Sequence, residues 1–303
     1  MKILVTGILP PWALKELTRT GAEVVNVPAD VYVDEAKFCE GIKGFDVYIS
    51  GGIESCTAKV INSSDVLKKI IFLGVDYKVY IDADAAAKKG IVIYNTPGAN
   101  SRAVAELTIM LMLMAARKAA KMLEDFGKKE WKNQTGTELK GKRLGLIGSG
   151  PIAQQVSIIA RGLGMRVSYW SRSGAKEEMK GRYSELQNLL SKSDILSLHI
   201  PKSAGLFLNA EAINKLKKGA ILVNTSSAEL VDPASLHAAL SSGRLACAAF
   251  DSFYAEGAKV WESPQRNLFE LGADRFFITP HAGWRTREAD DRMFEMAIEK
   301  LHA

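Results

Sequence analysis

The chain has 303 residues, of which 47% are hydrophobic and 24% charged, a composition typical of soluble globular proteins with about two domains at this length. No run of about 18 uncharged apolar residues is present, so we expect no membrane segment. The formal net charge is +6, but Lys and Arg are scattered. We therefore expect no nucleic-acid partner, and a small anionic ligand instead.

Cysteine usage indicates the compartment. The three cysteines show neither metal-ligand spacing nor a paired pattern: Cys39, Cys56 and Cys247. This predicts no metal site and a reducing, cytoplasmic environment.

Short β-rich runs alternate with helical patterns through the first hundred residues, which predicts a parallel sheet with helices on its faces. The predicted strands are Lys2–Val5, Glu23–Val27, Asp46–Ser50, Ile70–Leu73 and Ile91–Tyr94, and the predicted helices are Pro11–Thr20, Val33–Ile42 and Asp82–Lys89. Pro97–Ser101 is typical of a linker. A long apolar helix is predicted over Ala103–Lys118.

A second βα series begins near Lys142. Its six strands suit one doubly wound sheet: Arg143–Ile147, Arg166–Trp170, Ile195–His199, Ala220–Asn224, Ala246–Phe250 and Phe276–Thr279. A last helix, from about Arg287 to Leu301, closes the chain. The fold class is therefore α/β, with two doubly wound parallel sheets.

A glycine turn joins the strand Arg143–Ile147 to the next helix. Gly148, Gly150 and Ala153 fit the pattern G-x-G-x-x-G/A, in which the glycines allow a tight turn and close approach of a pyrophosphate. Pro151 and Ile152 open the helix, whose N-terminus favours an anion. The alternative, a glycine turn in an ordinary strand–helix connection, is disfavoured by this context. The turn predicts a dinucleotide site.

The end of the second strand selects the dinucleotide. NAD sites usually carry Asp or Glu there to bind the ribose hydroxyls, whereas this chain has Ser171, Arg172 and Ser173. Arginine and serine hydroxyls suit a 2′-phosphate, which a carboxylate would repel. We predict that NADP(H) is preferred over NAD(H). The alternative is that Arg172 is a solvated turn residue.

Several linked motifs now identify a resemblance. They are Asn95–Ser101 with Val104–Glu106, Glu138–Lys142, Ser197–Pro201, Val223–Thr225 with Leu230–Asp232, and Thr279–Gly283. With them the chain resembles, over nearly its full length, the D-isomer-specific 2-hydroxyacid dehydrogenases of the glycerate, phosphoglycerate and glyoxylate/hydroxypyruvate reductase types.

The resemblance implies an architecture. Residues 1–99 and 281–303 would form a flavodoxin-like substrate domain, with a Rossmann-type cofactor domain, residues 100–280, inserted in it and the active site in the cleft between them. Asp251 and the Thr225 backbone would hold the nicotinamide carboxamide, while His199 and Pro201 would line the adenine side. The helix Ala103–Lys118 would form a homodimer.

The chemistry of the family requires three groups. A histidine donates a proton to the carbonyl oxygen, a carboxylate charges that histidine, and an arginine grips the substrate carboxylate. His281 matches the acid, although a histidine after proline also caps turns. The arginine position holds Ser227 and the carboxylate position holds Tyr254. Neither can do the expected task, because one is a neutral single donor and the other is neutral at pH 7.

The substrate segments also depart from the family. By resemblance, Gly51, Gly74, Val75 and Arg285 would contact the substrate, but Asp76 adds a negative charge where the family has glycine. The candidates for a replacement cation are Arg285, Arg102 and Lys78, and Glu256 is a candidate partner for His281.

Two hypotheses follow. The first is an NAD(P)-dependent reductase with an altered pocket, acting on a small 2-oxo or 2-hydroxy acid or a related carbonyl compound. The second is a catalytically impaired NADP(H)-binding sensor or scaffold, since two of three groups are missing.

Overall fold

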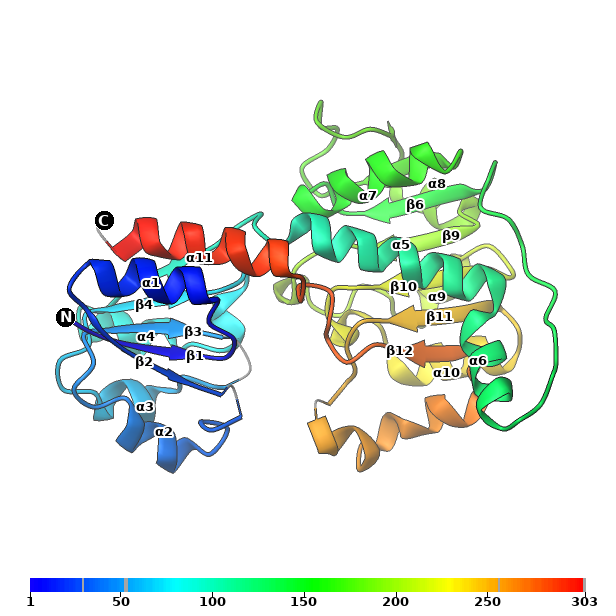
Figure 1. Cartoon of the computed structure of the whole chain (residues 1–303). Coiled ribbons are helices and arrows are strands. Elements are labelled where there is room, and N and C mark those ends of the chain that lie inside the picture. Colours follow the sequence, from blue (N-terminus) through cyan, green and yellow to red (C-terminus); the bar gives the residue numbers. More distant parts are fainter. Residues whose placement is uncertain (29, 52–53, 256, 302–303) are drawn as a thin grey trace. The chain divides into compact units, whose positions relative to one another are not determined.

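The chain forms two compact units in the computed structural model, which describes residues 1–28, 30–51, 54–255 and 257–301. One unit comprises Met1–Asn100 and Arg285–Ala303, and the other comprises Ser101–Trp284 (Figure 1). The second crossing of the chain was expected at residue 281. Residues 281–284 instead group with the second unit, where the side chain of Asp251 binds the backbone of Ala282 and Gly283.

The first unit is built on a five-stranded sheet in the order β2-β1-β3-β4-β5, with all neighbours parallel. This is the flavodoxin order, and it places a topological switch point between β1 and β3. The strands are β1 (Lys2–Thr6), β2 (Glu23–Val27), β3 (Val47–Ser50), β4 (Lys69–Phe72) and β5 (Val92–Asn95).

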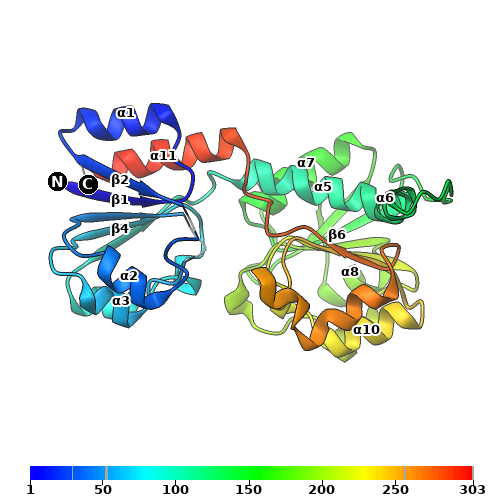
Figure 2. The same ribbon diagram turned by 60° about the horizontal axis from the view of Figure 1, so that its bottom comes forward.

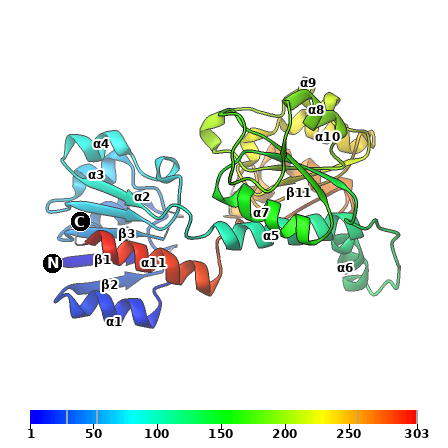
Figure 3. The same ribbon diagram turned by 90° about the horizontal axis from the view of Figure 1, so that it is seen from above.

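Helices cover both faces of this sheet, with α1 and α11 on one face and α2, α3 and α4 on the other (Figures 2 and 3). They are α1 (Pro11–Arg19), α2 (Glu35–Gly41), α3 (Ala58–Ser63), α4 (Ala83–Lys88) and α11 (Arg287–Leu301), and the 3-10 turn η1 (Tyr77–Val79) precedes α4. The chain returns to this unit through α11, whose Asp291 accepts a hydrogen bond from the Trp12 indole at 2.5 Å. The short helix α3 was not predicted; Thr57 caps it by accepting from Val60 N.

The second unit contains a seven-stranded parallel sheet in the order β12-β11-β10-β9-β6-β7-β8. Counted from β6, this is the Rossmann order 3-2-1-4-5-6 with one further strand. The strands are β6 (Arg143–Ile147), β7 (Arg166–Trp170), β8 (Arg182–Tyr183), β9 (Ile195–Leu198), β10 (Ala220–Asn224), β11 (Leu245–Phe250) and β12 (Phe276–Ile278). Six of these strands were predicted; β8 was missed because two residues carry no periodic pattern.

Helices lie on both faces of the second sheet too, α5 and α7 on one and α8, α9 and α10 on the other (Figures 2 and 3). They are α5 (Ser101–Arg117), α6 (Ala119–Gly127), α7 (Pro151–Gly162), α8 (Leu186–Lys192), α9 (Ala210–Lys215) and α10 (Pro233–Ser241), with 3-10 segments η2 (Lys202–Ala204), η3 (Ala228–Leu230), η4 (Gly257–Trp261) and η5 (Pro264–Leu271). Two separate apolar cores fill these layers.

The boundary between α5 and α6 is local. Lys118 adopts a left-handed conformation with φ of 52°, which ends α5 near its predicted limit and redirects the chain into α6. Ten residues of α5 are buried against the unit. Over the described residues, no helix combines the length and the apolar character needed to cross a membrane.

Candidate cofactor and active site

The glycine turn after β6 is fixed by its surroundings. Gly148 has φ of 114°, and a Cβ added there would collide with the carbonyl oxygen of His199 at the end of β9. The Gly148 amide donates to Trp170 O at 2.8 Å. Only glycine satisfies both the positive φ and the close approach. The turn is therefore held between the ends of β7 and β9.

Gly150 meets a different demand. It has φ of −71° and caps α7, and a Cβ there would have no heavy atom within 4 Å. Pro151 occupies the first helical turn, Ile152 follows it, and Ala153 is fully buried against the sheet. Within the described residues, no side chain caps this helix end by a hydrogen bond. A pyrophosphate fits here, because helix N-termini bind anions through their first backbone amides.

The turn after β7 contains no carboxylate. The Ser171 hydroxyl donates to Gly174 O at 2.6 Å, and Gly174 N donates to Ser171 O at 3.1 Å. Ser171 is buried, whereas Arg172 and Ser173 are exposed. Ser171 therefore shapes the turn, while Arg172 and Ser173 present their polar groups to solvent.

His199 follows β9 and is held as a neutral ring. Its Nε2 lies 2.9 Å from the Ser197 hydroxyl, and burial lowers its pKa to about 3. Nδ1 is buried and makes no hydrogen bond within the described part of the chain. Pro201 begins the turn η2 and is exposed.

The loop carrying His281 is anchored by Asp251, which follows β11 and is 3% exposed. Oδ1 of Asp251 accepts from the Thr279 hydroxyl at 2.6 Å and from Ala282 N at 2.9 Å, and Oδ2 accepts from Gly283 N at 2.7 Å. Burial raises the pKa of Asp251, while these hydrogen bonds and the nearby charge of His281 lower it. The carboxylate thus fixes the backbone on both sides of His281.

His281 itself adopts a left-handed conformation with φ of 52°, and its amide donates to Thr279 O at 2.9 Å. A non-glycine residue rarely occupies this region unless its surroundings impose it. The side chain is exposed. The Asp251 anchor therefore holds a strained backbone that presents the imidazole at the surface of the unit.

The segment after β10 is organised by Asn224, which is fully buried. Its amide group donates to Ser227 O at 2.8 Å, and its oxygen accepts from Ser226 N at 3.0 Å. Ser227 serves the turn through its carbonyl. The hydroxyl of Thr225 lies 2.9 Å from that of Thr108 on α5.

Tyr254 is tied to the interior of the second unit. Its hydroxyl donates to Val231 O at 2.8 Å, and its ring packs edge-on against Phe253. Burial raises the pKa of Tyr254, and the charge of Asp232 raises it further. Tyr254 is therefore a neutral phenol whose proton is already donated to the backbone.

In the first unit, Gly51 follows β3 at the switch point. Its amide donates to the Thr6 hydroxyl at 2.8 Å, and a Cβ there would collide with Thr6 O. The Thr6 hydroxyl in turn donates to the carboxylate of Glu54, which Tyr48 also contacts. A buried relay thus holds the backbone at Gly51.

The second predicted substrate loop follows β4. Gly74 N donates to Phe72 O at 2.9 Å and Gly74 O accepts from Thr96 N at 3.0 Å, while Val75 O accepts from the Asn95 side chain at 2.7 Å. The Gly74 amide is thus engaged within the loop. Val75 is exposed.

Two further residues of the predicted site are Arg285 and Glu256. Arg285 opens the returning segment of the first unit and is exposed. Glu256, considered as a partner of His281, lies outside the described residues.

Three structural roles escaped sequence reasoning. Asn224 and Thr279 were seen only as motif letters, yet they hold the two turns of the site. Glu54 was not noticed, although it is 1% exposed. A polar residue at or just after the end of a buried strand is the signal that could have found them.

Comparisons with known proteins agree with this geometry. Residues 109–283 match the family model "D-isomer specific 2-hydroxyacid dehydrogenase, NAD binding domain". The chain is 33% identical over 274 residues to a hydroxypyruvate reductase of Thermotoga maritima, covering 89% of this chain and 88% of that one.

Two solved structures are similar over 100% of this chain and 96% of theirs. One is the TT0316 protein of Thermus thermophilus, with a TM-score of 0.87 at 33% identity. The other is an acyclic imino acid reductase, Bsp5, in complex with NADPH and D-Arg, with a TM-score of 0.82 at 25% identity.

The chain therefore belongs to the D-isomer specific 2-hydroxyacid dehydrogenase family. The predicted fold class is confirmed, with two parallel-sheet α/β units of which the second is Rossmann-type. The protein is an oxidoreductase of the NAD(P)-dependent D-2-hydroxyacid dehydrogenase type.

Proposed function

We propose that this protein is an NADP(H)-preferring reductase for a small carbonyl compound, a 2-oxo acid or a related species, in a pocket altered from that of its relatives. The observation that carries the proposal is the turn after β7, where Arg172 and Ser173 are exposed and no carboxylate stands. A 2′-phosphate is attracted by such a turn and repelled by an acidic one.

Each residue of the proposed site has its own role in the reaction. A bound nicotinamide supplies the hydride. His281 donates a proton to the carbonyl oxygen, and Asp251 fixes the loop from which it does so. Thr225 and Asp251 lie at the ends of β10 and β11 and orient the nicotinamide ring. Gly150 and the first turn of α7 hold the pyrophosphate.

In this proposal, the groups that bind the substrate differ from those of the relatives. Ser227 replaces a bidentate cation by one neutral hydroxyl, and losing one preorganised donor typically costs about 10²–10³ in rate. Tyr254 provides no charge for His281, because its phenol is neutral and bonded to Val231 O. We infer that the first unit contributes the substrate contacts, from Gly51, Gly74, Val75 and Arg285. An imine is a reasonable candidate beside the oxo acids, since an imino acid reductase shares this fold.

Ser227 and Tyr254, which stand in place of the expected arginine and carboxylate, also favour a second function. A protein that binds NADP(H) without turnover, as a sensor or scaffold, needs the glycine turn but neither an arginine nor a carboxylate. The intact anchor of the His281 loop favours the reductase, because a binding protein has no need to hold that strained backbone.

Two measurements test the proposal. Fluorescence titration should give tighter binding of NADPH than of NADH, and Arg172→Gln should reduce that preference about tenfold, the effect of one charge-assisted contact. Absorbance at the nicotinamide band, with a panel of 2-oxo acids, aldehydes and imines, should reveal turnover. Tight NADPH binding with no turnover on any member would leave the sensor function; tighter NADH binding would refute the cofactor preference.

We also propose a homodimer through α5 and α6. Met110 and Leu113 on α5, Leu123 and Phe126 on α6, and the following Trp131 are exposed large hydrophobic residues, with Trp131 91% exposed. Such clustering is typical of an interface. Light scattering on Trp131→Ser with Phe126→Ser should show a shift toward monomer. The three cysteines are free and buried, which supports a reducing cytoplasm as the compartment.

A further inference from the structure

The positive charge of the protein belongs to one unit. The segment Ser101–Trp284 carries 25 Lys and Arg against 17 Asp and Glu, whereas the remaining residues carry 15 against 17. An anionic cofactor accounts for positive charge near the glycine turn. It does not account for the basic residues at the opposite ends of the strands, where Arg143, Arg166 and Arg182 begin β6, β7 and β8.

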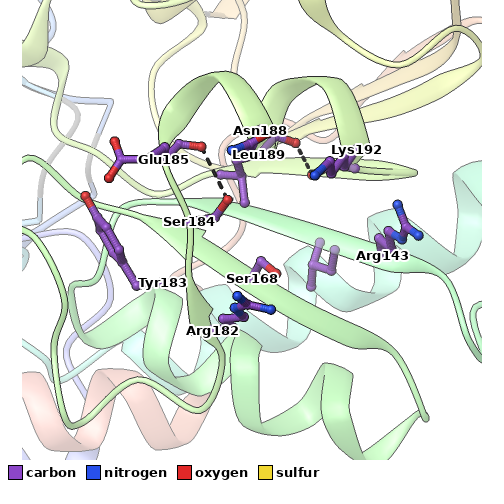
Figure 4. A pocket seen from close by; sticks show the side chains of 11 residues that line it. Arg143, Ser168, Arg182, Tyr183, Ser184, Glu185, Asn188, Leu189 and Lys192 are labelled. Carbon is purple, nitrogen blue, oxygen red and sulfur yellow. Dashed lines mark hydrogen bonds between the residues drawn. The ribbon is translucent and has the colours of Figure 1, made fainter.

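Two adjoining hollows lie at the amino ends of β6, β7 and β8. The first has a volume of about 550 Å³ and is lined by Arg143, Arg182 and Lys192, together with polar groups of Ser168 and Asn188 (Figure 4). The second, of about 590 Å³, shares Arg143, Ser168 and Arg182 and adds Arg161 and Arg166. Five cationic side chains therefore line the two hollows.

The first hollow borders a row of the sheet that contains small residues. Strand register pairs Gly145 with Ser168, and Ser168 with Arg182. A Cβ at Gly145 would meet Ser193 Oγ and Leu189 of α8, so this row of the sheet faces α8. Gly145 therefore lets α8 pack directly on the sheet at that point. Beside it, the small side chain of Ser168 lines the hollow, with Leu144 and Leu189 also among its lining residues.

These cations lack acidic partners within the described residues. None of the five forms an ion pair there, and Glu185, an exposed residue at the start of α8, is the acid that lines the first hollow. The nearby Asp194 is engaged elsewhere, since it accepts from the Arg143 backbone amide at 2.8 Å and pairs with Lys217. Uncompensated like charges repel one another and attract a multivalent anion.

We propose that these hollows form a second binding site, for a small molecule carrying at least two phosphate groups. Arginine guanidinium groups bind phosphate oxygens in pairs. The volume lies in the range of about 300–1,000 Å³ found for small-ligand pockets, and the half-buried Tyr183 and the side chains of Leu144 and Leu189 add apolar surface to the lining. A nucleic acid would need an extended basic strip rather than a recess.

This site is distinct from the cofactor turn. Arg143 is the first residue of β6 and Gly148 follows its last, so about 17 Å of strand separates them at about 3.3 Å per residue. Both ligands can then bind one chain together.

Isothermal titration calorimetry on the full chain, saturated with NADPH, tests the proposal with inorganic tripolyphosphate as the probe. We expect saturable binding of one tripolyphosphate per chain. Arg143→Gln with Arg182→Gln should weaken it at least tenfold, and Lys192→Gln less. Lys259→Gln with Arg266→Gln removes the same charge from exposed residues elsewhere in the unit and should leave the affinity within twofold.

Several outcomes would overturn the site. Equal weakening by both double variants would mean that only net charge attracts the probe, and absence of binding once NADPH is present would mean that the probe occupies the cofactor turn. Citrate binding as tightly as tripolyphosphate would overturn the assignment to phosphate. Melting temperatures measured without any anion establish that each variant is folded; if the double variant is not, Lys192→Gln and Arg182→Lys must each weaken binding for the site to stand.

Discussion

The turn after β6 and the segments after β10 and β11 all follow buried strands of one sheet, yet they keep the family pattern to different degrees. At the β6 turn the pattern letters are intact, and their reason is steric: a Cβ at Gly148 would collide with His199 O. After β10 and β11 the backbone turns are equally well held, by Asn224 and Asp251. Ser227 and Tyr254 stand on these segments, at the positions where the resemblance leads us to expect the arginine and the carboxylate of the family.

This contrast separates two ways of building a site. Where the backbone is the binding element, a side chain at a position such as Gly148 would collide with the neighbouring backbone, so the residue type is informative. Where a side chain does the chemistry, the turn survives its replacement, because Ser227 serves the turn through its carbonyl. The glycine turn is thus constrained by geometry at Gly148, whereas the backbone bonds of the turn after β10 place no demand on the side chain at position 227.

Removal of the proton donor should have the largest effect. His281→Gln keeps the polar size of the side chain but cannot donate a proton in the same way, and general acid catalysis typically contributes about 10²–10⁴-fold. We expect kcat on the best substrate of the panel to fall by that factor, in a stopped-flow assay at saturating NADPH. NADPH affinity should not change. A loss below threefold would mean that another group supplies the proton.

The Asp251 anchor should come next. Asp251→Asn turns one acceptor oxygen into a donor facing either Gly283 N or the Thr279 hydroxyl, and an unsatisfied buried group costs about 1–3 kcal/mol. We expect a lower free energy of unfolding and a fall of about tenfold in kcat, measured by urea denaturation and steady-state kinetics.

The pH dependence of that variant gives a second readout. Because burial raises the folded pKa of Asp251 above 3.8, the folded state keeps a proton that the unfolded chain releases. Its contribution to the free energy of unfolding therefore falls as the pH rises from 3.8 through the folded pKa. Asp251→Asn should remove that slope. An unchanged slope would show that other carboxylates set it.

The two glycines of the turn offer a matched pair. Gly148→Ala meets both a positive φ and the His199 carbonyl, so the melting temperature and NADPH affinity should both fall. Gly150→Ala has no neighbour within 4 Å and an ordinary φ, so the fold should keep its melting temperature while NADPH affinity falls about tenfold or more. Equal NADPH affinity in Gly150→Ala and the parent chain would place the pyrophosphate elsewhere.

Most of the fold was readable from periodicity. The long strands and helices pack one apolar face against a sheet, and their bounds fall within a few residues of expectation; the N-cap Asp34 explains why α2 begins at Glu35 rather than Val33. The elements that were missed are short or irregular. β8 has two residues, and α6 begins only because Lys118 turns the chain in a left-handed conformation.

The candidate site was less readable, because its organisation depends on contacts distant in sequence. Asp251 binds residues about thirty positions away, and no local pattern reports that. Tyr254 was expected to stand at the carboxylate position; its bond to Val231 O could not be foreseen from spacing. The sequence singled out Asp251 and Tyr254, but their hydrogen bonds became visible only in the structure.

The smallest expected effect is an increase in kcat/KM, from a substitution at Ser227. Ser227→Arg leaves the backbone bonds of the turn unchanged, since Asn224 binds its carbonyl, and returns the bidentate cation that grips a 2-oxo acid carboxylate. We expect kcat/KM for glyoxylate or hydroxypyruvate to rise several-fold, less than the ~10²–10³ associated with one donor, because Tyr254 still provides no charge for His281. Ser227→Lys restores charge without the planar fork and should gain less. Tyr254→Glu is a poorer test, because it removes the bond to Val231 O and the packing on Phe253. No gain from either Ser227 variant would mean that this position does not face the carbonyl.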